Sequence, residues 1–308
     1  MTKCVLLLSV VMLGTIPLVG VRADPSKTPQ ETAQPHVNSS NRGGPVHQDI
    51  SYGTAGGHPL LLDVYEPEAH TDLRPAVVLI HGGGWTSFDK SIMRAMATFL
   101  AQSGFVAFSV DYRLFHGNEN LWPTQLEDVQ RAVRWIRANA AKYRVDPDHI
   151  GAFGHSAGGQ LAALLGMEDT RDNSDRALAK YSSRVQAVVD VSGPSDLTSH
   201  RDPDGDVFLT AFFGGDYAQR PEVWQDASPV FHVSKKASPF LIVHGTQDTD
   251  VPLARSQELA GKLKQARVPV KLVTVEDVHT FRTPEANKRL ALETQAFFFQ
   301  YLHSGNLR

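Results

Sequence analysis

Short aliphatic runs alternate with longer amphipathic segments along most of this 308-residue chain. An aliphatic run of about five residues is too short for a full helix, and in this alternating order it is typical of a buried strand in a parallel sheet. The amphipathic segments between the runs predict helices on both faces of that sheet. The strands expected on this basis are residues 76–80, 106–110, 150–153, 187–191, 240–243 and 270–275.

Apolar residues at helical spacing mark the covering helices. The residues at this spacing are Ile92, Met96, Phe99 and Leu100, then Leu126, Val129, Val133 and Ile136, then Leu259 and Leu263. A last helix is expected from about Pro284 to Leu302. An extended run at 46–52, a turn at 53–57 and an alternating stretch at 60–65 predict a hairpin whose strands lie at a sheet edge.

The N-terminal residues predict an export signal. Lys3 is followed by an apolar stretch at 5–21, and the chain then offers a cleavage point after Ala23. The alternative is an uncleaved membrane anchor, but glycine and proline interrupt the stretch, which is short for a span of ~20 residues. We therefore expect a signal peptide at 1–23 and a secreted or periplasmic protein without stable membrane association.

The segment at 24–45 is rich in Pro, Gln, Asn, Ser and Thr, which predicts a flexible leader. The rest of the chain, 46–308, has the size and apolar content of one folded domain. A cap-like insertion is expected at about 192–239. The single cysteine, Cys4, would leave with the signal peptide, so the mature domain must rely on its core rather than on disulfides.

The charge balance argues against one class of partner. The 30 Lys and Arg residues and 33 Asp and Glu residues are spread along the chain and give a net charge of -3. Nucleic-acid backbones are held by clustered basic side chains, so we expect no nucleic-acid partner.

One serine stands in a pattern with a chemical meaning. The sequence Gly-His-Ser-Ala-Gly at 154–158 follows a predicted strand and precedes a helix-forming stretch at 160–165. A strand, sharp turn and helix of this kind expose the serine on a strained corner above the sheet. The bare pattern arises by chance in roughly one chain in ten, so its context matters. Ser156 is the candidate nucleophile.

A glycine run at 82–84 follows directly on another predicted strand. Backbone N–H groups aimed at a developing oxyanion lower the barrier to acyl transfer, and glycines let the main chain come close. The expected donors are the N–H groups of Gly83, Gly84 and Ala157. The alternative is a plain glycine turn between strand and helix. We interpret His81 as an anchor for this loop rather than as a base.

A serine nucleophile needs an imidazole base, and the imidazole needs a carboxylate that orients it. The loop after the strand at 240–243 carries Asp248 and Asp250; we favour Asp248 and keep Asp250 as the alternative. The loop after the next strand carries His279, the candidate base. Because the base must be neutral, activity should fall on acidification near about pH 6 to 7. The order serine, aspartate, histidine is that of α/β-hydrolases.

With these residues in place, the chain from about residue 46 resembles the α/β-hydrolase superfamily. Specifically, it resembles the bacterial carboxylesterases related to hormone-sensitive lipase and the acetyl-xylan and feruloyl esterases, the BD-FAE-like group. Further matching segments are Tyr112-Arg113-Leu114, the helix at 125–135, Val145-Asp146-Pro147, His244-Gly245 and Val251-Pro252. Two departures are Gly84, where kynurenine formamidase-like relatives carry tyrosine, and Thr280, where similar esterases often carry glycine.

The resemblance implies an α/β-hydrolase fold, with a mostly parallel sheet flanked by helices and a short cap. It further implies a serine carboxylesterase that acts through an acyl-enzyme formed by the triad Ser156, Asp248 and His279, without metal or organic cofactor. Alternatives are an amidase, peptidase or arylformamidase-like hydrolase on the same fold, and a catalytically silent binding protein.

The insertion at 192–239 carries five aromatic residues: Phe208, Phe212, Phe213, Tyr217 and Trp224. They can form a substrate wall or pack the insertion onto the domain, and the two readings are equally favoured. Trp85 and Phe213 are the candidate substrate-binding residues. A short cap suits compact acyl groups on accessible alcohols, so the expected substrate is a small or polysaccharide-linked ester, such as an acetyl or feruloyl ester of plant polysaccharide.

Overall fold

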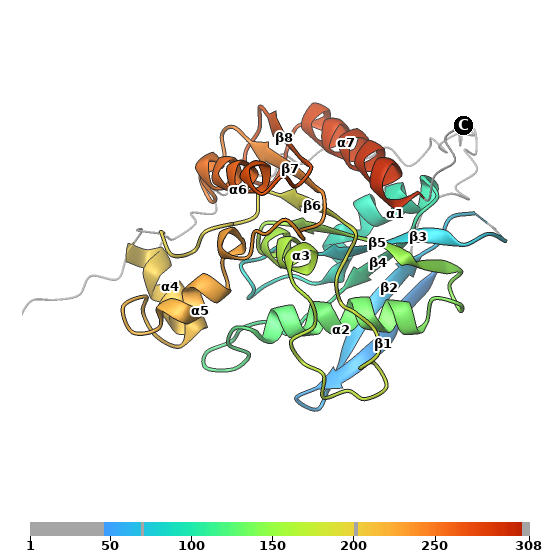
Figure 1. Cartoon of the computed structure of the whole chain (residues 1–308), viewed down its shortest axis with the longest axis horizontal. Helices are drawn as coiled ribbons and strands as arrows, with labels where there is room; N and C mark the ends of the chain where they lie inside the picture. Colours follow the sequence, from blue (N-terminus) through green and yellow to red (C-terminus); the bar gives the residue numbers. More distant parts are fainter. Residues whose placement is uncertain (1–45, 69–70, 200–202, 304–308) are drawn as a thin grey trace, which may run out of the picture. The chain divides into compact units, whose positions relative to one another are not determined.

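The computed structural model describes residues 46–68, 71–199 and 203–303. The signal peptide expected at 1–23 and the leader expected at 24–45 lie outside these residues. Eight strands form one sheet in the order β1-β2-β4-β3-β5-β6-β7-β8 (Figure 1). The strands are β1 (His47–Ala55), β2 (His58–Tyr65), β3 (Arg74–Ile80), β4 (Val106–Val110), β5 (Val145–His155), β6 (Ala187–Val191), β7 (Phe240–Gly245) and β8 (Val270–Val275).

The sheet is mostly parallel, as the alternating sequence pattern predicts. Every neighbouring pair from β4 to β8 is parallel, and only β2 runs against its neighbours. The hairpin turn is tighter than expected, because residues 53–55 belong to β1 and the turn is made by Gly56 and Gly57, both with positive φ. Of the two hairpin strands, only β1 lies at a sheet edge, since β2 is paired on both sides, which corrects the expectation for the hairpin.

The helices cover both faces of the sheet (Figure 1). Residues of α1 (Arg94–Gln102) and α7 (Pro284–Leu302) belong to the core on one face, and residues of α2 (Thr124–Ala138), α3 (Ala157–Met167) and α6 (Leu253–Gln265) to the core on the other. The period of two along β3 explains this division, because Val77 and Leu79 enter the first core while Val78 and Ile80 enter the second. This arrangement confirms the expected α/β-hydrolase fold.

One helix begins later than its apolar spacing predicts. Residues Lys90–Met93 form a short 3-10 helix, η1, and α1 starts at Arg94. The carboxylate of Asp89 caps η1 by accepting a hydrogen bond from the N–H of Ser91. Ile92 is therefore turned away from the core and is 47% exposed.

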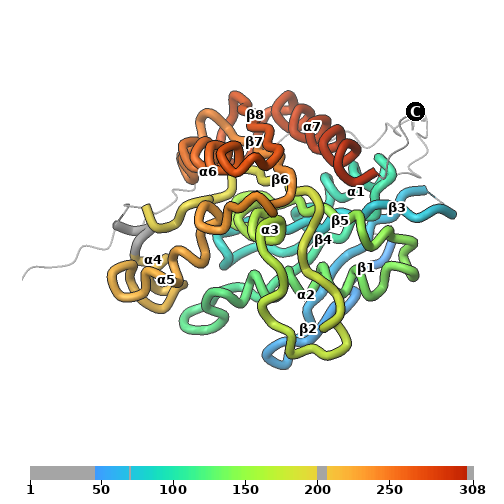
Figure 2. Tube along the Cα trace, viewed as in Figure 1, coloured from blue at the N-terminus to red at the C-terminus, as the bar shows by residue number. Residues whose placement is uncertain are grey.

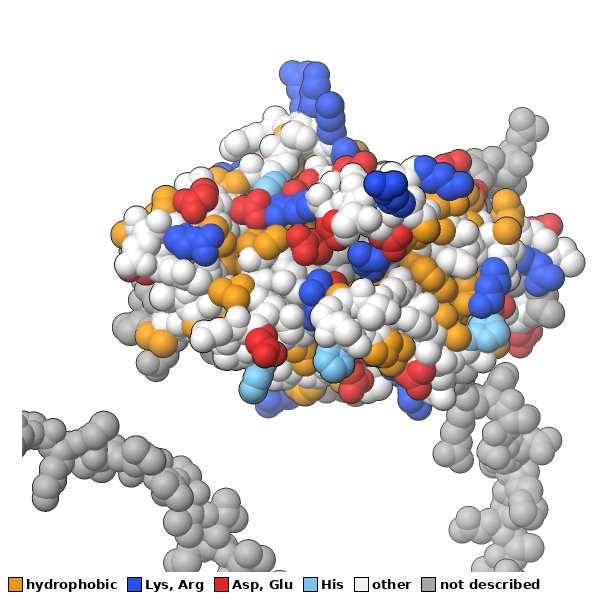
Figure 3. Space-filling model, turned by 90° about the horizontal axis from the view of Figure 1, so that it is seen from below, with side chains coloured by type: hydrophobic (Ala, Val, Ile, Leu, Met, Phe, Trp, Pro, Cys, Tyr) orange, Lys and Arg blue, Asp and Glu red, His pale blue; other side chains and the backbone are white. Residues whose placement is uncertain are grey.

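The chain between β6 and β7 forms α4 (Pro203–Phe213), α5 (Pro221–Asp226) and the 3-10 helix η2 (Pro229–Phe231). Figure 2 shows α4 and α5 next to each other, and the rings of Phe213 and Trp224 join them with centroids 4.9 Å apart. On the face seen in Figure 3, basic and acidic side chains are interspersed. Within the described ranges, no helix has the length and apolar character needed to cross a membrane.

A buried acid, Asp190 on β6, lies beneath the turn that carries Ser156. Its Oδ1 accepts a hydrogen bond of 2.9 Å from the N–H of Gly193. A Cβ on Gly159 or Gly193 would lie only 2.4 or 2.3 Å from this oxygen, so both glycines are needed for the close packing. Burial raises the pKa of Asp190 to about 6, against the opposing effects of the Gly193 N–H and His244.

Asp190→Asn should stabilise the protein at alkaline pH. Because the pKa of Asp190 is raised in the fold, its contribution to stability is full below the unfolded value near 4 and is lost as the pH rises through about 6. An asparagine stays neutral, so the variant should gain about 3 kcal/mol of unfolding free energy at pH 8 and only about 1 kcal/mol at pH 4.5. Urea unfolding at the two pH values measures this difference.

Asp277 provides the control of opposite sign. Hydrogen bonds from the N–H and hydroxyl of Thr283 and from the N–H of Val278 lower the pKa of Asp277 to about 2, although burial opposes them. Its stabilising contribution is therefore present above the unfolded pKa and lost on acidification, so Asp277→Asn should destabilise the protein at pH 8. Equal stability of wild type and Asp190→Asn at pH 8 would contradict the assignment of a raised pKa.

Candidate active site

Ser156 occupies a strained corner between β5 and α3. β5 ends at His155, α3 begins at Ala157, and Ser156 between them has φ 57° and ψ −122°. Non-glycine residues rarely adopt positive φ, and such strain persists only where the surroundings enforce it. Here the N–H of Ser156 donates a 2.8 Å hydrogen bond to Val191 O on β6. The strand, turn and helix predicted around the serine are all present.

The glycines of the motif are required by backbone packing. A Cβ on Gly154 would lie 1.9 Å from Gly158 O, and a Cβ on Gly158 would lie 2.1 Å from Ile80 O at the end of β3. Both contacts are with backbone atoms and cannot be relieved by moving a side chain. The same close approach brings α3 and the loop after β3 together at the serine.

The glycine run after β3 borders Ser156. A Cβ on Gly82 would lie 3.2 Å from Ser156 Cβ, so the loop passes directly beside the serine. Gly83 and Gly84 have φ 106° and 58°, values that favour glycine. Among the described residues, the N–H groups of Gly83, Gly84 and Ala157 donate to no protein acceptor. Ala157 is the first residue of α3, where an unpaired N–H is expected and the helix dipole favours negative charge.

His81 lies in the core below this loop and does not line the pocket beside Ser156. Its ring stacks on Tyr112 with centroids 4.2 Å apart, and its Nδ1 is 2.7 Å from Gly82 O. The hydroxyl of Tyr112 donates a 3.0 Å hydrogen bond to His81 O. Burial lowers the pKa of His81, outweighing its contact with Gly82. These contacts favour the role of anchor.

The structure places Asp248 beside His279. His279 Nδ1 lies 2.7 Å from Asp248 Oδ2, and the Asp248 side chain is completely buried. Burial alone would raise the pKa of this carboxyl, but hydrogen bonds from His244, His279 and the Val251 N–H outweigh it and hold the pKa well below its usual range. The side chain of Asp250 is exposed at the pocket mouth, and Asp250 contributes only its N–H to Asp248 Oδ1.

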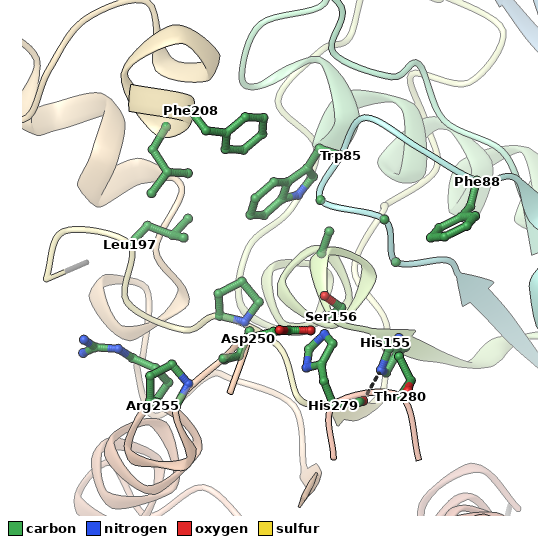
Figure 4. A pocket seen from close by; sticks show the side chains of 18 of the residues that line it. Trp85, Phe88, His155, Ser156, Leu197, Phe208, Asp250, Arg255, His279 and Thr280 are labelled. Carbon is green, nitrogen blue, oxygen red and sulfur yellow. Dashed lines mark hydrogen bonds between the residues drawn. The ribbon is translucent and has the colours of Figure 1, made fainter. Parts of the chain in front are cut away.

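Ser156 and His279 open into one pocket (Figure 4). No hydrogen bond joins their side chains among the described residues, and such bonds commonly tighten only when substrate binds. The backbone of His279 is fixed from the serine's side, because His155 Nε2 lies 2.8 Å from His279 O. His155 therefore links the strand that carries the serine to the loop that carries the histidine.

The pocket has a volume of about 560 Å³ and an apolar wall. Trp85, Phe208, Leu209 and Leu197 form this wall, which joins the glycine loop to the chain between β6 and β7. Trp85 is held by its Nε1–H, which donates to Gln160 Oε1 at 3.1 Å, and its ring stacks on Phe208. Polar groups from Asp196, Asp250, Arg255 and Thr280 also line the pocket.

Phe213 does not line the pocket, contrary to the expectation for this residue. It is 1% exposed and packs between Phe212 and Trp224 inside the insertion. Phe208, earlier on the same helix, takes the position at the wall. Sequence reasoning also missed Ile92 and Phe88, which line the pocket and are 47% and 62% exposed. The helical spacing assigned Ile92 to the core. Phe88 lies in a loop with a positive φ, and no sequence pattern around it indicates that its ring borders the pocket.

The described residues contain no group of three or more His, Cys, Asp or Glu placed to hold a metal ion. What the site can do follows from the residues gathered there. A strained serine, free N–H groups, and an imidazole hydrogen-bonded to a buried carboxylate form the arrangement that nucleophilic acyl transfer requires. The apolar wall beside the serine can exclude water from an acyl group.

Comparisons with known proteins agree with this geometry. The chain is 32% identical over 226 residues to the probable carboxylic ester hydrolase LipM of Mycobacterium tuberculosis, which covers 70% of this chain and 51% of LipM. The chain thus spans about half the length of the curated relatives it matches.

Two solved structures are similar along most of their length. A truncated carbohydrate esterase from gut microbiota is 27% identical, with a TM-score of 0.70 over 82% of this chain and 95% of that one. Esterase 2 of Thermogutta terrifontis, phosphorylated by paraoxon, is 27% identical, with a TM-score of 0.71 over 84% of this chain and 96% of that one. The BD-FAE family model matches residues 62–263, from β2 to α6. The chain belongs to the BD-FAE family.

Proposed function

We propose that this protein is a serine esterase that hydrolyses carboxylic esters through an acyl-enzyme. The observation that carries the proposal is the 2.7 Å contact between His279 and the buried carboxylate of Asp248, in a pocket shared with the strained Ser156. The names of the similar mycobacterial and Thermogutta proteins, which are ester hydrolases, support the same chemistry.

In the proposed mechanism, Ser156 Oγ attacks the ester carbonyl carbon while His279 Nε2 accepts the hydroxyl proton. Asp248 holds the imidazole by Nδ1 and stabilises the imidazolium. The N–H groups of Gly83, Gly84 and Ala157 donate to the oxyanion of the tetrahedral intermediate.

The tetrahedral intermediate collapses to the acyl-enzyme when the bond between its central carbon and the alcohol oxygen breaks. His279 gives its proton to that oxygen, and the alcohol leaves. A water molecule then attacks the acyl-enzyme, again giving its proton to His279. The acid leaves, and the proton returns to Ser156.

The substrate and the location of the protein are also proposals. We propose that the acyl group is acetyl or feruloyl, that the alcohol belongs to a plant polysaccharide, and that the protein is exported to reach it. The likeness to a carbohydrate esterase supports the choice of alcohol. The apolar wall of Trp85 and Phe208 offers an aromatic surface for an acyl group, and the polar lining at Arg255 and Asp250 offers partners for hydroxyl groups.

A substrate panel tests the reaction class. Hydrolysis of p-nitrophenyl acetate, butyrate and octanoate is compared with that of p-nitroacetanilide, acetylated xylan and feruloylated sugars. We expect ester hydrolysis to exceed anilide hydrolysis by orders of magnitude. Turnover of the anilide at the rate of the acetate would favour an amidase instead. Mass analysis of exported protein tests cleavage after Ala23.

Phe208→Ala should change acyl-chain preference. Removing this ring deepens the pocket wall, so the ratio of kcat/KM for octanoate to that for acetate should rise about tenfold. Phe231→Ala is the matched control, since Phe231 is about half exposed on η2 and does not line the pocket. An unchanged ratio in Phe208→Ala would contradict the placement of the acyl group at this wall.

A further inference from the structure

A second histidine, His244, contacts the carboxylate of Asp248. His244 lies near the end of β7, and its side chain is completely buried. Its Nε2 is 3.2 Å from Asp248 Oδ2 and 2.9 Å from Val251 O. Both neighbours only accept hydrogen bonds, so Nε2 must carry a proton that the two oxygens share.

The other ring nitrogen of His244 is fixed as well. Its Nδ1 lies 2.7 Å from the hydroxyl of Ser256 on α6, and Ser256 is completely buried. A hydroxyl both donates and accepts, so it satisfies Nδ1 with or without a proton. The ring is therefore held from both sides, with its Nε2–H aimed at Asp248 Oδ2.

This contact falls on the oxygen that serves His279. Asp248 Oδ1 accepts the N–H groups of Asp250 and Val251 at 3.0 and 2.9 Å, while Oδ2 faces both histidines. A donor on Oδ2 limits the positions this oxygen can take and withdraws part of its negative charge. His244 thus affects both the position of the carboxylate and its strength as partner of the imidazolium.

We infer that His244 is a positioning residue of the esterase, an inference that rests on the proposed function. It holds Asp248 Oδ2 in place for His279 and sets how strongly the carboxylate stabilises protonated His279. The titratable groups that face His244 from neighbouring elements are Asp190 on β6 and His155 on β5. Both remain in place in the variants below.

Two variants of His244 separate the donor from the packing. His244→Gln keeps an N–H near the position of Nε2, whereas His244→Leu fills similar space without a donor. For His244→Leu we expect kcat to be about 30- to 100-fold lower than in wild type. We also expect the acid limb of the pH profile, the pH at which kcat/KM falls to half on acidification, to lie about 0.5 to 1 pH unit higher. The limb moves up because a carboxylate without this donor stabilises protonated His279 more strongly. His244→Gln should recover kcat to within about fivefold of wild type, with the wild-type limb.

The controls keep the test decisive. Ser238→Ala removes a buried hydroxyl that donates to Val185 O just before β7, away from Asp248, and should leave the limb unchanged. If His244→Leu does not fold, Ser256→Ala takes its place, with a severalfold loss of kcat and a smaller shift in the same direction. A loss of rate with an unmoved limb, or equal effects of Gln and Leu, would overturn the inference. Ester hydrolysis by wild type but not by Ser156→Ala shows separately that the proposed function holds.

Discussion

Ser156→Ala is expected to lower kcat for p-nitrophenyl acetate by at least about 10⁴-fold, because Ser156 is the only serine among the described residues that line the pocket. The variant should fold normally, since alanine can take the backbone conformation of Ser156 at about the same cost. Steady-state hydrolysis and a thermal unfolding curve, measured on the same preparation, check both expectations.

Ser192→Ala is the matched control for this prediction. Like Ser156, Ser192 has a positive φ, here 51°, and it lies directly after β6, but it is buried and does not line the pocket. Its substitution should change kcat by less than about threefold. An alanine at position 156 with wild-type activity would contradict the role of Ser156.

Asp248→Asn should lower kcat by about 10³- to 10⁴-fold while largely preserving the shape of the site. The asparagine removes the negative charge that stabilises protonated His279. Its NH₂ group also disfavours the tautomer with a proton on Nδ1, so Nε2 can no longer accept the proton of Ser156. The rate at saturating ester, measured across pH, reports this loss.

Asp250→Asn gives the contrasting result. The side chain of Asp250 is exposed, and its N–H, which donates to Asp248, is unchanged by the substitution. We expect kcat within about threefold of wild type. If Asp250→Asn instead lost activity and Asp248→Asn kept it, the carboxylate would be assigned wrongly.

Most of the sheet was predictable because its signal is local. β4 and β6 have the bounds that their aliphatic runs predict, since a parallel strand that is buried on both faces needs apolar residues on both. The bounds of β8 are also as predicted, although this edge strand is only partly buried. The turn at Ser156 was predictable for a similar reason, because at positions 154 and 158 a side chain would collide with backbone atoms and only glycine fits.

The sequence-based predictions that were wrong or left two candidates concern residues whose roles depend on tertiary contacts. Asp248 and Asp250 are two residues apart in one loop, and only the approach of His279 from the loop after β8 distinguishes them. Phe208 and Phe213 share α4, and the packing of α5 against Phe213 decides which one faces the pocket. Likewise, His244 matched the family pattern, but its bond to Asp248 emerges only when β7 and its loop are folded.

The most direct test of the central claim is covalent labelling by paraoxon, which phosphorylates the similar Thermogutta esterase. Peptide mass spectrometry of the inactivated protein should find one diethylphosphoryl group on the peptide that contains Ser156, with loss of activity in proportion to labelling. Ser156→Ala should remain unlabelled. A label on another residue that accounts for the loss of activity, or hydrolysis that persists in fully labelled protein, would contradict Ser156 as the nucleophile.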